Sequence, residues 1–395
     1  MSYTASLYQA ISEVPSHEWD SLCADPVDPF MDRRLLAAVE QSMSADGKFF
    51  YVLMRDADGR PMAAAALCVF RVDGAVLAGP TLKRWAEAIR RWWPGYARLK
   101  VLFCGLPVSA GQKHLRLHPE ADAALAIAAL DDTMRRLARQ ERVWFIVAKE
   151  FERSDLAQLE SLKQHGYVLA DSLPMNHFAP RFSSLDEYCR ALRSHYRYKI
   201  KKSLRKFDAA GLQLETLVDP QGILTLYTDD LHQLYNAVVD RAESKLEILP
   251  AEFFRQLARQ LPGEVSLSVI RQNERIVAFG WGLTRGGAYR SLFIGVDYSL
   301  NAETDLYFNT MLRGIDVALQ KGATDIFVGQ AADDFKARIG CVQQPRFLYL
   351  KSPNRLLQAI FRRIARFVFP KPTPPQQHDL FKPEAIADAE VAANA

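Results

Sequence analysis

The stretch Asp305–Gly329, DLYFNTMLRGIDVALQKGATDIFVG, contains a helix and the strand that follows it. Four apolar side chains recur at intervals of four, three and four residues: Phe308, Leu312, Ile315 and Leu319. This spacing predicts a helix with one apolar face, which we expect to lie on a sheet. Gly322 is typical of a helix end, and the apolar run Asp325–Gly329 predicts a short strand.

The same order of elements occurs earlier in the chain. A predicted strand at Lys100–Gly105 (KVLFCG) precedes a helix from about Pro119 to Gln140 and a strand at Val143–Ala148 (VWFIVA). The later copy opens correspondingly with a strand at Arg290–Gly295 (RSLFIG). The helix of the earlier copy is also apolar on one side, through Ile127, Leu130, Met134 and Leu137. The offset between matching residues falls along the chain, so the earlier copy has the longer loops.

Further strands are predicted on either side of each copy: Pro61–Val72, Ala75–Ala78 and Tyr167–Phe178 around the first, and Arg275–Leu283, Ala288–Phe293 and Arg346–Lys351 around the second. The repeated order predicts an α/β protein with two tandem domains, residues 1–181 and 182–369, each a mixed sheet flanked by helices. The proline cluster PKPTPP at Pro370–Pro375 ends regular structure. Because the Ala/Glu/Asp-rich end has little apolar content, residues 370–395 are predicted to be a disordered tail.

The composition fits a folded protein in a reducing compartment. Of the 395 residues, 49% are hydrophobic and 24% are charged, and the formal net charge of +4 is too small for a chain that packages nucleic acid along its whole length. The five cysteines are scattered without a C-x-x-C pair and the eight histidines lack ligand spacing, so we expect no metal site. We expect a cytoplasmic protein, because no apolar run approaches the roughly eighteen residues of a membrane-spanning helix and no signal-peptide pattern is present.

The segment Arg190–Lys206 is strongly basic. It holds eight cations and no acid: Arg190, Arg193, Arg197, Lys199, Lys201, Lys202, Arg205 and Lys206. On a helix, one face would be apolar, through Leu192, Tyr196, Ile200 and Leu204. The neighbouring stripe would be basic, through Arg193, Arg197, Lys201 and Arg205. Like charges this dense repel one another, which favours an anionic partner over a solvated helix. Donor phosphates, a tRNA stem and a glycan-lipid pyrophosphate are all open alternatives.

The basic segment and the second copy together resemble a known family. The residues that carry this resemblance are RSHYRYKIKKSLRKF (Arg193–Phe207) and DLYFNTMLRGIDVALQKGATDIFVGQAADDFKARIGC, which ends at Cys341. They are similar to tandem GNAT proteins related to the Fem-type peptidoglycan aminoacyltransferases, the FemAB-like proteins, and the resemblance covers roughly Tyr51–Lys351. It implies two GNAT-like domains that transfer an acyl or aminoacyl group to a small-molecule or glycan amine in cell-envelope, polysaccharide or secondary-metabolite synthesis.

The chain departs from the GNAT enzymes that use acetyl-CoA in one turn. Those enzymes share an R/Q-x-x-G-x-G/A turn, and the backbone N–H groups of this turn hold the pyrophosphate of acetyl-CoA. The equivalent turn here is YSLNAET, Tyr298–Thr304, without glycine, and Asp305 adds a negative charge at the helix start. In the first copy the turn has one glycine, Gly111, and basic neighbours: Lys113, His114 and Arg116. We therefore expect no tightly bound cofactor, with acyl-CoA or aminoacyl-tRNA as co-substrate.

Polar residues follow the predicted strands of the second copy: Asp297, Tyr298, Tyr307, Gln330, Asp333, Asp334 and Lys336. Ligands of α/β sheets are reached at strand ends, and acyl transfer to an amine needs a base and an acid. We expect Asp297 to be the base, Tyr307 the acid and Lys336 the cation that stabilises an oxyanion. The donor would be contacted by Gln330 and by four cations of the basic segment: Arg193, Arg197, Lys201 and Lys202. The alternative assigns Asp297 to a turn, Tyr307 to packing and Lys336 to the surface.

The segment Leu356–Val368, LLQAIFRRIARFV, predicts a basic amphipathic helix. It would either lie on an anionic membrane surface, peripheral to the inner face of the membrane, or dock on the protein core. Three functions are open. The chain is expected to be an N-acyltransferase that uses acyl-CoA or a similar donor. The alternatives are a tRNA-dependent Fem-type aminoacyltransferase and a non-catalytic glycan- or nucleic-acid-binding protein in a GNAT shell.

Overall fold

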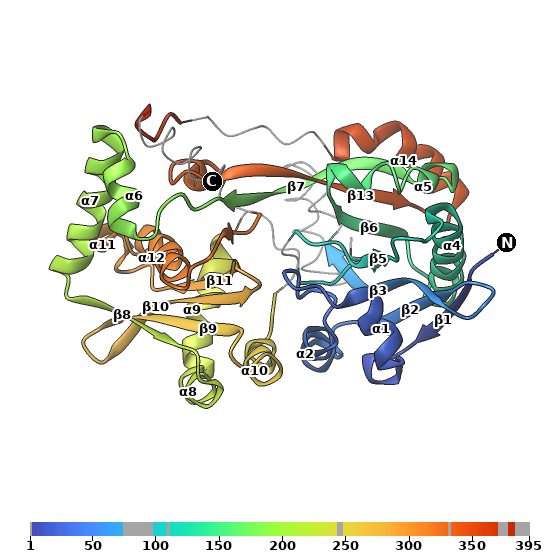
Figure 1. Cartoon of the computed structure of the whole chain (residues 1–395), viewed down its shortest axis with the longest axis horizontal. Coiled ribbons are helices and arrows are strands. Elements are labelled where there is room, and N and C mark those ends of the chain that lie inside the picture. Colours follow the sequence, from blue (N-terminus) through green and yellow to red (C-terminus); the bar gives the residue numbers. More distant parts are fainter. Residues whose placement is uncertain are drawn as a thin grey trace, which may run out of the picture. The chain divides into compact units, whose positions relative to one another are not determined.

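The computed structural model describes residues 2–73, 98–108, 111–242, 248–330, 333–369 and 378–383. The chain divides into two compact units, each built from three segments of sequence. The first unit comprises Met1–Pro174, Glu243–Gln256 and Pro345–Thr373, and the second comprises Met175–Ala242, Leu257–Gln344 and Pro374–Ala395. Each unit contains mixed sheet flanked by helices, as the repeat predicts (Figure 1).

The strands of the first unit follow the order β1-β2-β3-β4-β6-β13, and β5 pairs with β3. All neighbours are antiparallel except β4 and β6. The strands are β1 (Thr4–Tyr8), β2 (Lys48–Arg55), β3 (Pro61–Asp73), β4 (Arg98–Cys104), β5 (Leu115–Leu117), β6 (Phe145–Phe151) and β13 (Val342–Lys351). The helices are α1 (Ser16–Cys23), α2 (Arg33–Met43), α4 (Ala123–Gln140), α5 (Ser161–Gln164) and α14 (Arg355–Val368), with 3-10 turns η1 (Ile11–Glu13) and η3 (Arg153–Asp155). The predicted strand Ala75–Ala78 lies outside the described residues.

Helix α4 buries the apolar face that its spacing predicts. The four side chains on that face join the core of the first unit: Ile127, Leu130, Met134 and Leu137. The helix begins at Ala123 and not near Pro119, because the Asp122 side chain accepts hydrogen bonds from the N–H groups of Ala124 and Leu125 and forms the N-cap.

The C-terminal helix α14 packs on the first unit. Its Phe361 and Ala365 are buried among apolar side chains of β4, β6 and β13. Strand β13 leads into it, and the Lys351 Nζ at the end of that strand lies 3.0 Å from Oδ1 of the buried Asp131 in α4. This burial ties the helix to the first unit, whereas the sequence-based boundaries place it in the second domain.

The strands of the second unit follow the order β7-β12-β11-β10-β9-β8. They are β7 (Val168–Phe178), β8 (Leu212–Leu217), β9 (Val265–Gln272), β10 (Arg275–Arg285), β11 (Ala288–Val296) and β12 (Asp325–Phe327). Only the part of β7 from Met175 onward belongs to this unit. The helices are α6 (Leu185–Ala191), α7 (Ser194–Ala209), α8 (Pro220–Leu226), α9 (Asp229–Arg241), α11 (Asn301–Thr304), α12 (Leu306–Gln320) and α13 (Asp333–Ala337), and α10 (Ala251–Gln260) crosses the boundary between the units. Along the chain, each copy runs through three antiparallel strands, a helix, a parallel strand, a helix and a last strand, as the repeat predicts. The last strand of each copy, however, pairs with the sheet of the other: β7 pairs with β12, and β13 pairs with β6.

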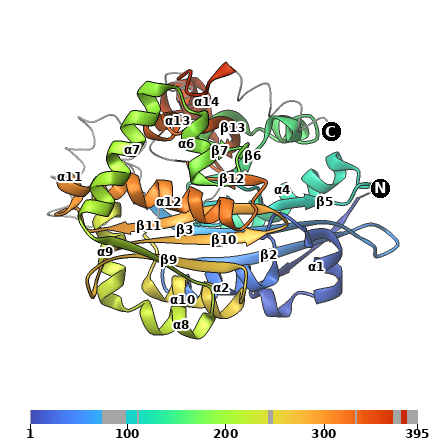
Figure 2. The same cartoon turned by 60° about the vertical axis from the view of Figure 1, so that its left-hand side comes forward.

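Different helices cover the two faces of the sheet in the second unit (Figure 2). Successive side chains of a strand point to opposite faces. On β11, the Phe293 ring lies 6.0 Å from the ring of Tyr235 in α9. The next residue, Ile294, packs instead with the apolar cluster that contains Leu312 of α12. Helices α9 and α12 therefore hold β11 between them.

The parallel strands β11 and β12 pair over three residues only. The register ends where Arg290 is opposite Phe327, although β11 continues to Val296. The residues after β12 pair with β7, where the Asn176 N–H donates to the Gly329 carbonyl at 3.1 Å and accepts from the Val328 N–H at 2.9 Å through its own carbonyl. Among the described residues, β11 therefore has no ladder to β12 beyond Arg290.

Residues 378–383 dock on the second unit. Leu380 is buried, and Phe381 forms a β-bridge with Leu192. The Arg193 N–H donates to the Leu380 carbonyl at 2.8 Å, and the Arg193 guanidinium pairs with Asp379. The prediction of a disordered tail is therefore wrong for these residues, because two apolar side chains suffice to anchor them. The other residues of the predicted tail, 370–377 and 384–395, lie outside the described part of the chain.

Gly295 of β11 provides a test of this packing. A Cβ at Gly295 would overlap the Phe279 ring and lie 2.8 Å from the Cβ of Leu234, whereas a Cβ at Gly314 in α12 would meet nothing within 4 Å. We expect Gly295→Ala to lower the free energy of unfolding by about 1–3 kcal/mol. The matched change Gly314→Ala should raise it by about 0.5–1 kcal/mol. Urea unfolding measures both, and equal effects of the two changes would contradict the arrangement.

Candidate functional site

Aromatic side chains connect the end of β11 with the residues that follow β12. Tyr298 lies two residues after β11 and stacks on Tyr307 in the first turn of α12, with ring centroids 6.3 Å apart and an interplanar angle of 23°. The Tyr307 ring meets the ring of Phe335 in α13 edge-on at 5.6 Å. The Arg241 guanidinium at the end of α9 lies 3.9 Å from the Tyr298 centroid. The strand ends that the sequence singles out are thus in contact.

Asp297 serves the turn after β11. Its carboxylate accepts hydrogen bonds from the Ser299 N–H at 3.0 Å and hydroxyl at 2.6 Å, and it lies 2.5 Å from the Arg275 guanidinium. Burial raises the pKa of Asp297, but the Ser299 hydrogen bonds and the Arg275 charge outweigh burial and hold this pKa below its usual range. A carboxylate with a lowered pKa is a weak base. The geometry therefore supports the alternative that makes Asp297 a turn residue.

Tyr307 keeps its hydroxyl proton at neutral pH. Burial, with a smaller contribution from Tyr298, raises the pKa of Tyr307 above its usual value. The side chain is half-buried at the junction of α12 and α13. A protonated phenol at the edge of a sheet can donate a hydrogen bond to a developing negative charge, but its raised pKa makes it a weaker proton donor than an ordinary tyrosine.

The first turn of α12 is occupied by the protein's own groups. The Asn301 Oδ1 accepts a hydrogen bond from the Tyr307 N–H at 2.8 Å. Asp305, the N-cap residue, adopts a left-handed conformation with φ 49°, and its carboxylate lies 2.8 Å from the Lys206 Nζ of α7. A pyrophosphate at this helix start would meet a carboxylate and a backbone donor that is already used. The arrangement does not fit the phosphate site of acetyl-CoA-dependent GNAT enzymes.

Lys336 and Gln330 lie where β12 ends. Lys336 is buried, so the alternative that places it on the surface is wrong, and its Nζ lies 3.6 Å from the position that a Cβ would take on Gly329. Gly329 has φ 81°, and its carbonyl accepts a hydrogen bond from the Asn176 side-chain amide at 3.0 Å. Gln330 follows and is half-buried. Strand β7 therefore positions the backbone beside Lys336. The side chains of Asp333 and Asp334 lie outside the described part of the structure.

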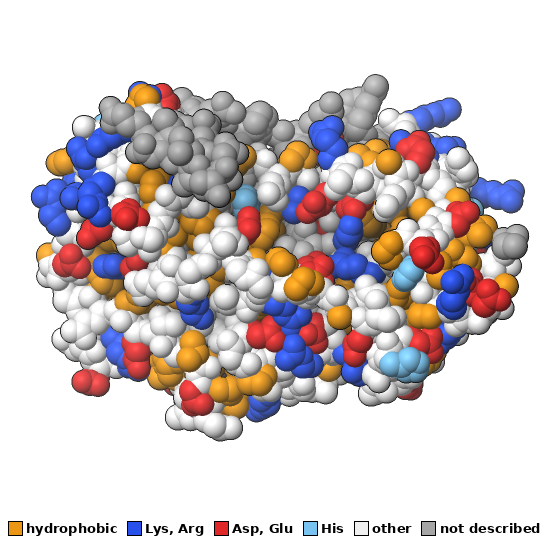
Figure 3. Space-filling view, in the orientation of Figure 1, with side chains coloured by type: hydrophobic (Ala, Val, Ile, Leu, Met, Phe, Trp, Pro, Cys, Tyr) orange, Lys and Arg blue, Asp and Glu red, His pale blue; other side chains and the backbone are white. Residues whose placement is uncertain are grey.

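Most of the basic segment forms α7, and part of the predicted basic stripe lines one pocket. A pocket of about 480 Å³ is lined by Ser194, Arg197, Tyr198, Lys201, Leu204 and Arg205. Within the described ranges, no carboxylate forms an ion pair with Arg197, Lys201 or Arg205. Figure 3 shows Lys and Arg side chains gathered over α7. This surface offers positive charge to an anion, together with the exposed Tyr198 ring.

The other five cations of the segment do not line that pocket: Arg190, Arg193, Lys199, Lys202 and Lys206. Arg193 is held by Asp379, and Lys206 is held by Asp305. Lys202 is exposed and does not line the pocket. Of the predicted donor contacts, the structure thus brings only Arg197 and Lys201 together.

The corresponding loop of the first unit uses its charges internally. Lys113 pairs with Asp155, and Arg116 pairs with Asp28. The Gly111 carbonyl accepts a hydrogen bond from the Arg346 Nε at 2.7 Å, and His114 is buried. Burial, aided by nearby positive charges, lowers the pKa of His114 well below its usual value, so its imidazole is neutral. This loop shows no comparable basic pocket among its described residues.

The sequence analysis missed three residues of the site. Arg241 lies in a helix whose pattern gave no signal for it, and Asn176 lies inside a strand more than a hundred residues before its partner. Tyr198 could have been identified, because it is the aromatic residue between the stripe cations Arg197 and Lys201. Among the described residues, no group of three or more His, Cys, Asp or Glu side chains could hold a metal ion. No helix in the described ranges is long and apolar enough to span a bilayer.

Comparison with known sequences shows a match along most of the chain. The model of the FemAB-like family, whose description is peptidoglycan biosynthesis and recognition, matches residues 10–365 of this chain. Two curated sequences from strains of Mycobacterium tuberculosis, both named 8-amino-7-oxononanoate synthase 2, are 24% identical over 347 residues, which is 86% of this chain and 44% of theirs. The chain spans less than half the length of these relatives.

Solved structures show the same fold at low sequence identity. A crystal structure of FemX has a TM-score of 0.53 at 13% identity and covers 91% of this chain and 99% of FemX. The C-terminal domain of a lysylphosphatidylglycerol synthetase from Agrobacterium fabrum has a TM-score of 0.51 at 11% identity, and the match covers 93% of this chain and 100% of that domain. A tandem GNAT protein from the clavulanic acid biosynthesis pathway has a TM-score of 0.51 at 11% identity, and the match covers 89% of this chain and 99% of that protein. These likenesses confirm the predicted tandem GNAT-like fold.

The role of Asp297 in the turn can be tested through pH. Because its folded pKa lies below the unfolded value, its contribution to stability is present above the unfolded pKa and is lost as the pH falls through the folded pKa. We expect Ser299→Ala to lower the free energy of unfolding by about 1 kcal/mol at neutral pH, and the difference to shrink below about pH 4. Urea unfolding across pH measures this. Ser21→Ala is the control, because that hydroxyl donates to a backbone carbonyl. A difference for Ser299→Ala that stays constant with pH would contradict the prediction.

Proposed function

Since the chain belongs to the FemAB-like family of peptidoglycan biosynthesis and recognition, we propose that it transfers an aminoacyl group from tRNA to an amine on a glycan or small molecule. The pocket on α7 carries this proposal. It combines three cations without a carboxylate partner in the described ranges, Arg197, Lys201 and Arg205, with one exposed aromatic ring, Tyr198.

Cations and an aromatic ring together suit the end of a nucleic acid. Phosphates of the backbone bind to Arg and Lys side chains, and unpaired bases stack on Tyr. The pocket, with a volume of about 480 Å³, is open to solvent along α7, so a long carrier can extend beyond the pocket. The occupied first turn of α12, with the Asp305 carboxylate, favours tRNA over acyl-CoA as the carrier.

The chemistry proposed for the site is aminolysis of an ester. The acceptor nitrogen attacks the carbonyl carbon, a C–N bond forms and the C–O bond to the carrier breaks. The carrier oxygen takes up a proton and leaves as a hydroxyl, and the nitrogen releases one proton to water, which balances the step. Tyr307 holds a proton at neutral pH and would donate to the leaving oxygen. Lys336 would stabilise the negative charge that develops on the carbonyl oxygen. We assign no base, because Asp297 is committed to its turn.

The donor site is tested by charge removal on α7. We expect Arg197→Gln combined with Lys201→Gln to weaken binding of aminoacyl-tRNA about tenfold or more at low salt. The slope of log affinity against log salt concentration should fall by the amount that corresponds to roughly one to two phosphate contacts. Filter binding or fluorescence anisotropy over a salt series measures both quantities.

A matched control removes the same charge elsewhere. Arg135→Gln combined with Arg136→Gln takes two exposed cations from α4, where each pairs with a carboxylate. This variant should bind tRNA as the parent does. If both variants lose affinity equally, binding is due to overall charge and the assignment of the pocket fails. If acyl-CoA binds to the α7 pocket and aminoacyl-tRNA does not, the donor is acyl-CoA.

The role of Tyr307 is tested by removal of its hydroxyl. We expect Tyr307→Phe to lower kcat of aminoacyl transfer about a hundredfold while KM for the donor stays unchanged, because the ring still stacks and only the proton is lost. The control is Tyr188→Phe, which removes a buried hydroxyl that donates to the Ile339 carbonyl in the same unit. A Tyr307→Phe variant with normal kcat would remove Tyr307 from the mechanism.

A further inference from the structure

Helix α14 of the first unit has two apolar faces. One face is docked, because Phe361 and Ala365 are about 5% exposed within the core of this unit. The other face is open to solvent: Leu356 is 72% exposed, Ile360 48% and Ile364 43%. These three residues recur every four positions and so form one stripe along the helix. Single exposed apolar side chains are ordinary on a protein surface, but an aligned stripe beside an already buried face indicates a second contact.

Arginines follow the exposed stripe. Helix α14 contains no acid, and its exposed cations include Arg355, Arg362 and Arg363. In the described part of the chain, no carboxylate pairs with any of these three. A helix with an apolar stripe, adjoining Arg side chains and no acid has the pattern of a segment that lies in the interface of an anionic bilayer.

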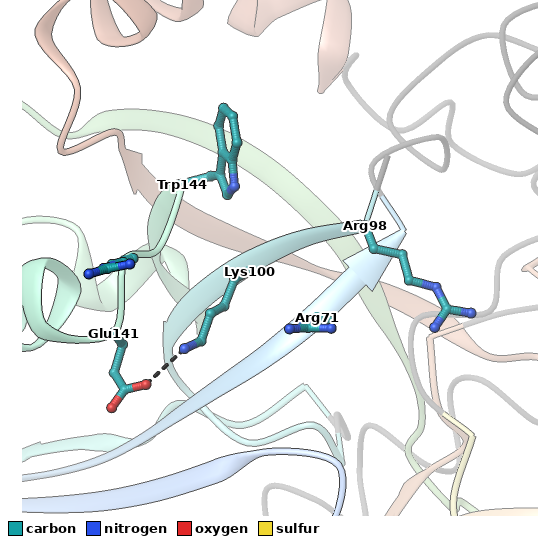
Figure 4. A pocket seen from close by; sticks show the side chains of 6 residues that line it. Arg71, Arg98, Lys100, Glu141 and Trp144 are labelled. Carbon is teal, nitrogen blue, oxygen red and sulfur yellow. Dashed lines mark hydrogen bonds and ion pairs between the residues drawn. The ribbon is translucent and has the colours of Figure 1, made fainter. Parts of the chain in front are cut away.

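A basic pocket lies next to this helix in the same unit. The Ser352 hydroxyl just before α14 donates to the Trp144 carbonyl at 2.9 Å, and the Phe145 ring packs edge-on against Phe361 at 5.6 Å. The indole of Trp144 is 54% exposed. Trp144 and five charged residues line a pocket of about 440 Å³, shown in Figure 4: Arg71, Arg98, Lys100, Glu141 and Arg142.

Most of the positive charge in that pocket is uncommitted. Glu141 lies 2.8 Å from both Lys48 and Lys100 and neutralises part of their charge. Arg71, Arg98 and Arg142 form no ion pair with a carboxylate of the described residues. The pocket can therefore accept a phosphate from outside the chain.

We propose that α14 and the adjoining pocket dock the chain on an anionic phospholipid surface. The Leu356, Ile360 and Ile364 side chains enter the boundary of the acyl chains, and the arginines of α14 contact lipid phosphates. Trp144 lies at the depth of the headgroups, where indoles are enriched, and the pocket holds one phosphate. A second copy of the chain would bring two rows of arginine together, and a nucleic acid would leave the apolar stripe in water. The inference does not rest on the proposed transfer, because docking needs neither donor nor acceptor.

The experiment is sedimentation of the full chain with vesicles. We expect binding to vesicles of phosphatidylcholine with about 30% phosphatidylglycerol and little binding to phosphatidylcholine alone, with a loss of binding at high salt. Changing Leu356, Ile360 and Ile364 together to Ser should lower the partition coefficient about tenfold or more. Changing Arg355, Arg362 and Arg363 together to Gln should lower it by a similar factor.

Matched controls separate the docking face from general effects. Val218→Ser removes an exposed apolar side chain elsewhere, and Arg60→Gln with Arg135→Gln and Arg136→Gln removes three exposed, ion-paired cations from the first unit. Both controls should bind vesicles as the parent does, and circular dichroism should show that every variant is folded. Equal binding to both vesicle types, or normal binding by the Ser variant, overturns the proposal. So does a dimer in solution that the Ser variant converts to a monomer, because the stripe is then an interface between copies.

Discussion

The short pairing between β11 and β12 is the constraint on which the candidate site depends. Buried backbone groups need partners, and those of Val328 and Gly329 find theirs on Asn176 of β7 and not on β11. The end of β11 can therefore turn into Tyr298 and α11 without completing a ladder to β12. Tyr307 then meets Phe335, and Lys336 comes beside Gly329. A few hydrogen bonds on one strand thus determine which side chains surround the site.

Features that repeat at short intervals could be predicted from the sequence, and features that depend on distant partners could not. Both one-sided helices and the duplicated order of elements follow from local periodicity. Strand β2 escaped prediction because six of its eight residues are buried in succession, so apolar and polar residues do not alternate. The turn role of Asp297 depends on Arg275 across a hairpin, and the loss of Arg193 from the basic stripe depends on Asp379. Ion pairs of this kind have no period along the chain.

The two copies of the fold use charge in different ways. In the first unit, Lys113 of the loop after β4 pairs with Asp155, and Arg116 of β5 pairs with Asp28, so these two cations are neutralised within the unit. In the second unit, α7 directs Arg197 and Lys201 to solvent beside Tyr198. These segments of the two copies thus differ in the charge that they offer to a ligand, and such asymmetry is consistent with function residing in sites and not in the fold.

The return of β13 and α14 to the first unit places most of the second unit between segments of the first along the chain. The first 174 residues lack β13, the strand that pairs with β6, and the buried Asp131 lacks the Lys351 cation. During synthesis, the N-terminal half therefore leaves the ribosome with an open sheet edge and an incompletely neutralised buried carboxylate. Its completion waits until the second unit has been made as far as Gln344, although domains generally fold in the order of their synthesis. The closing contact spans a long stretch of chain, which slows folding and exposes the edge to other strands meanwhile.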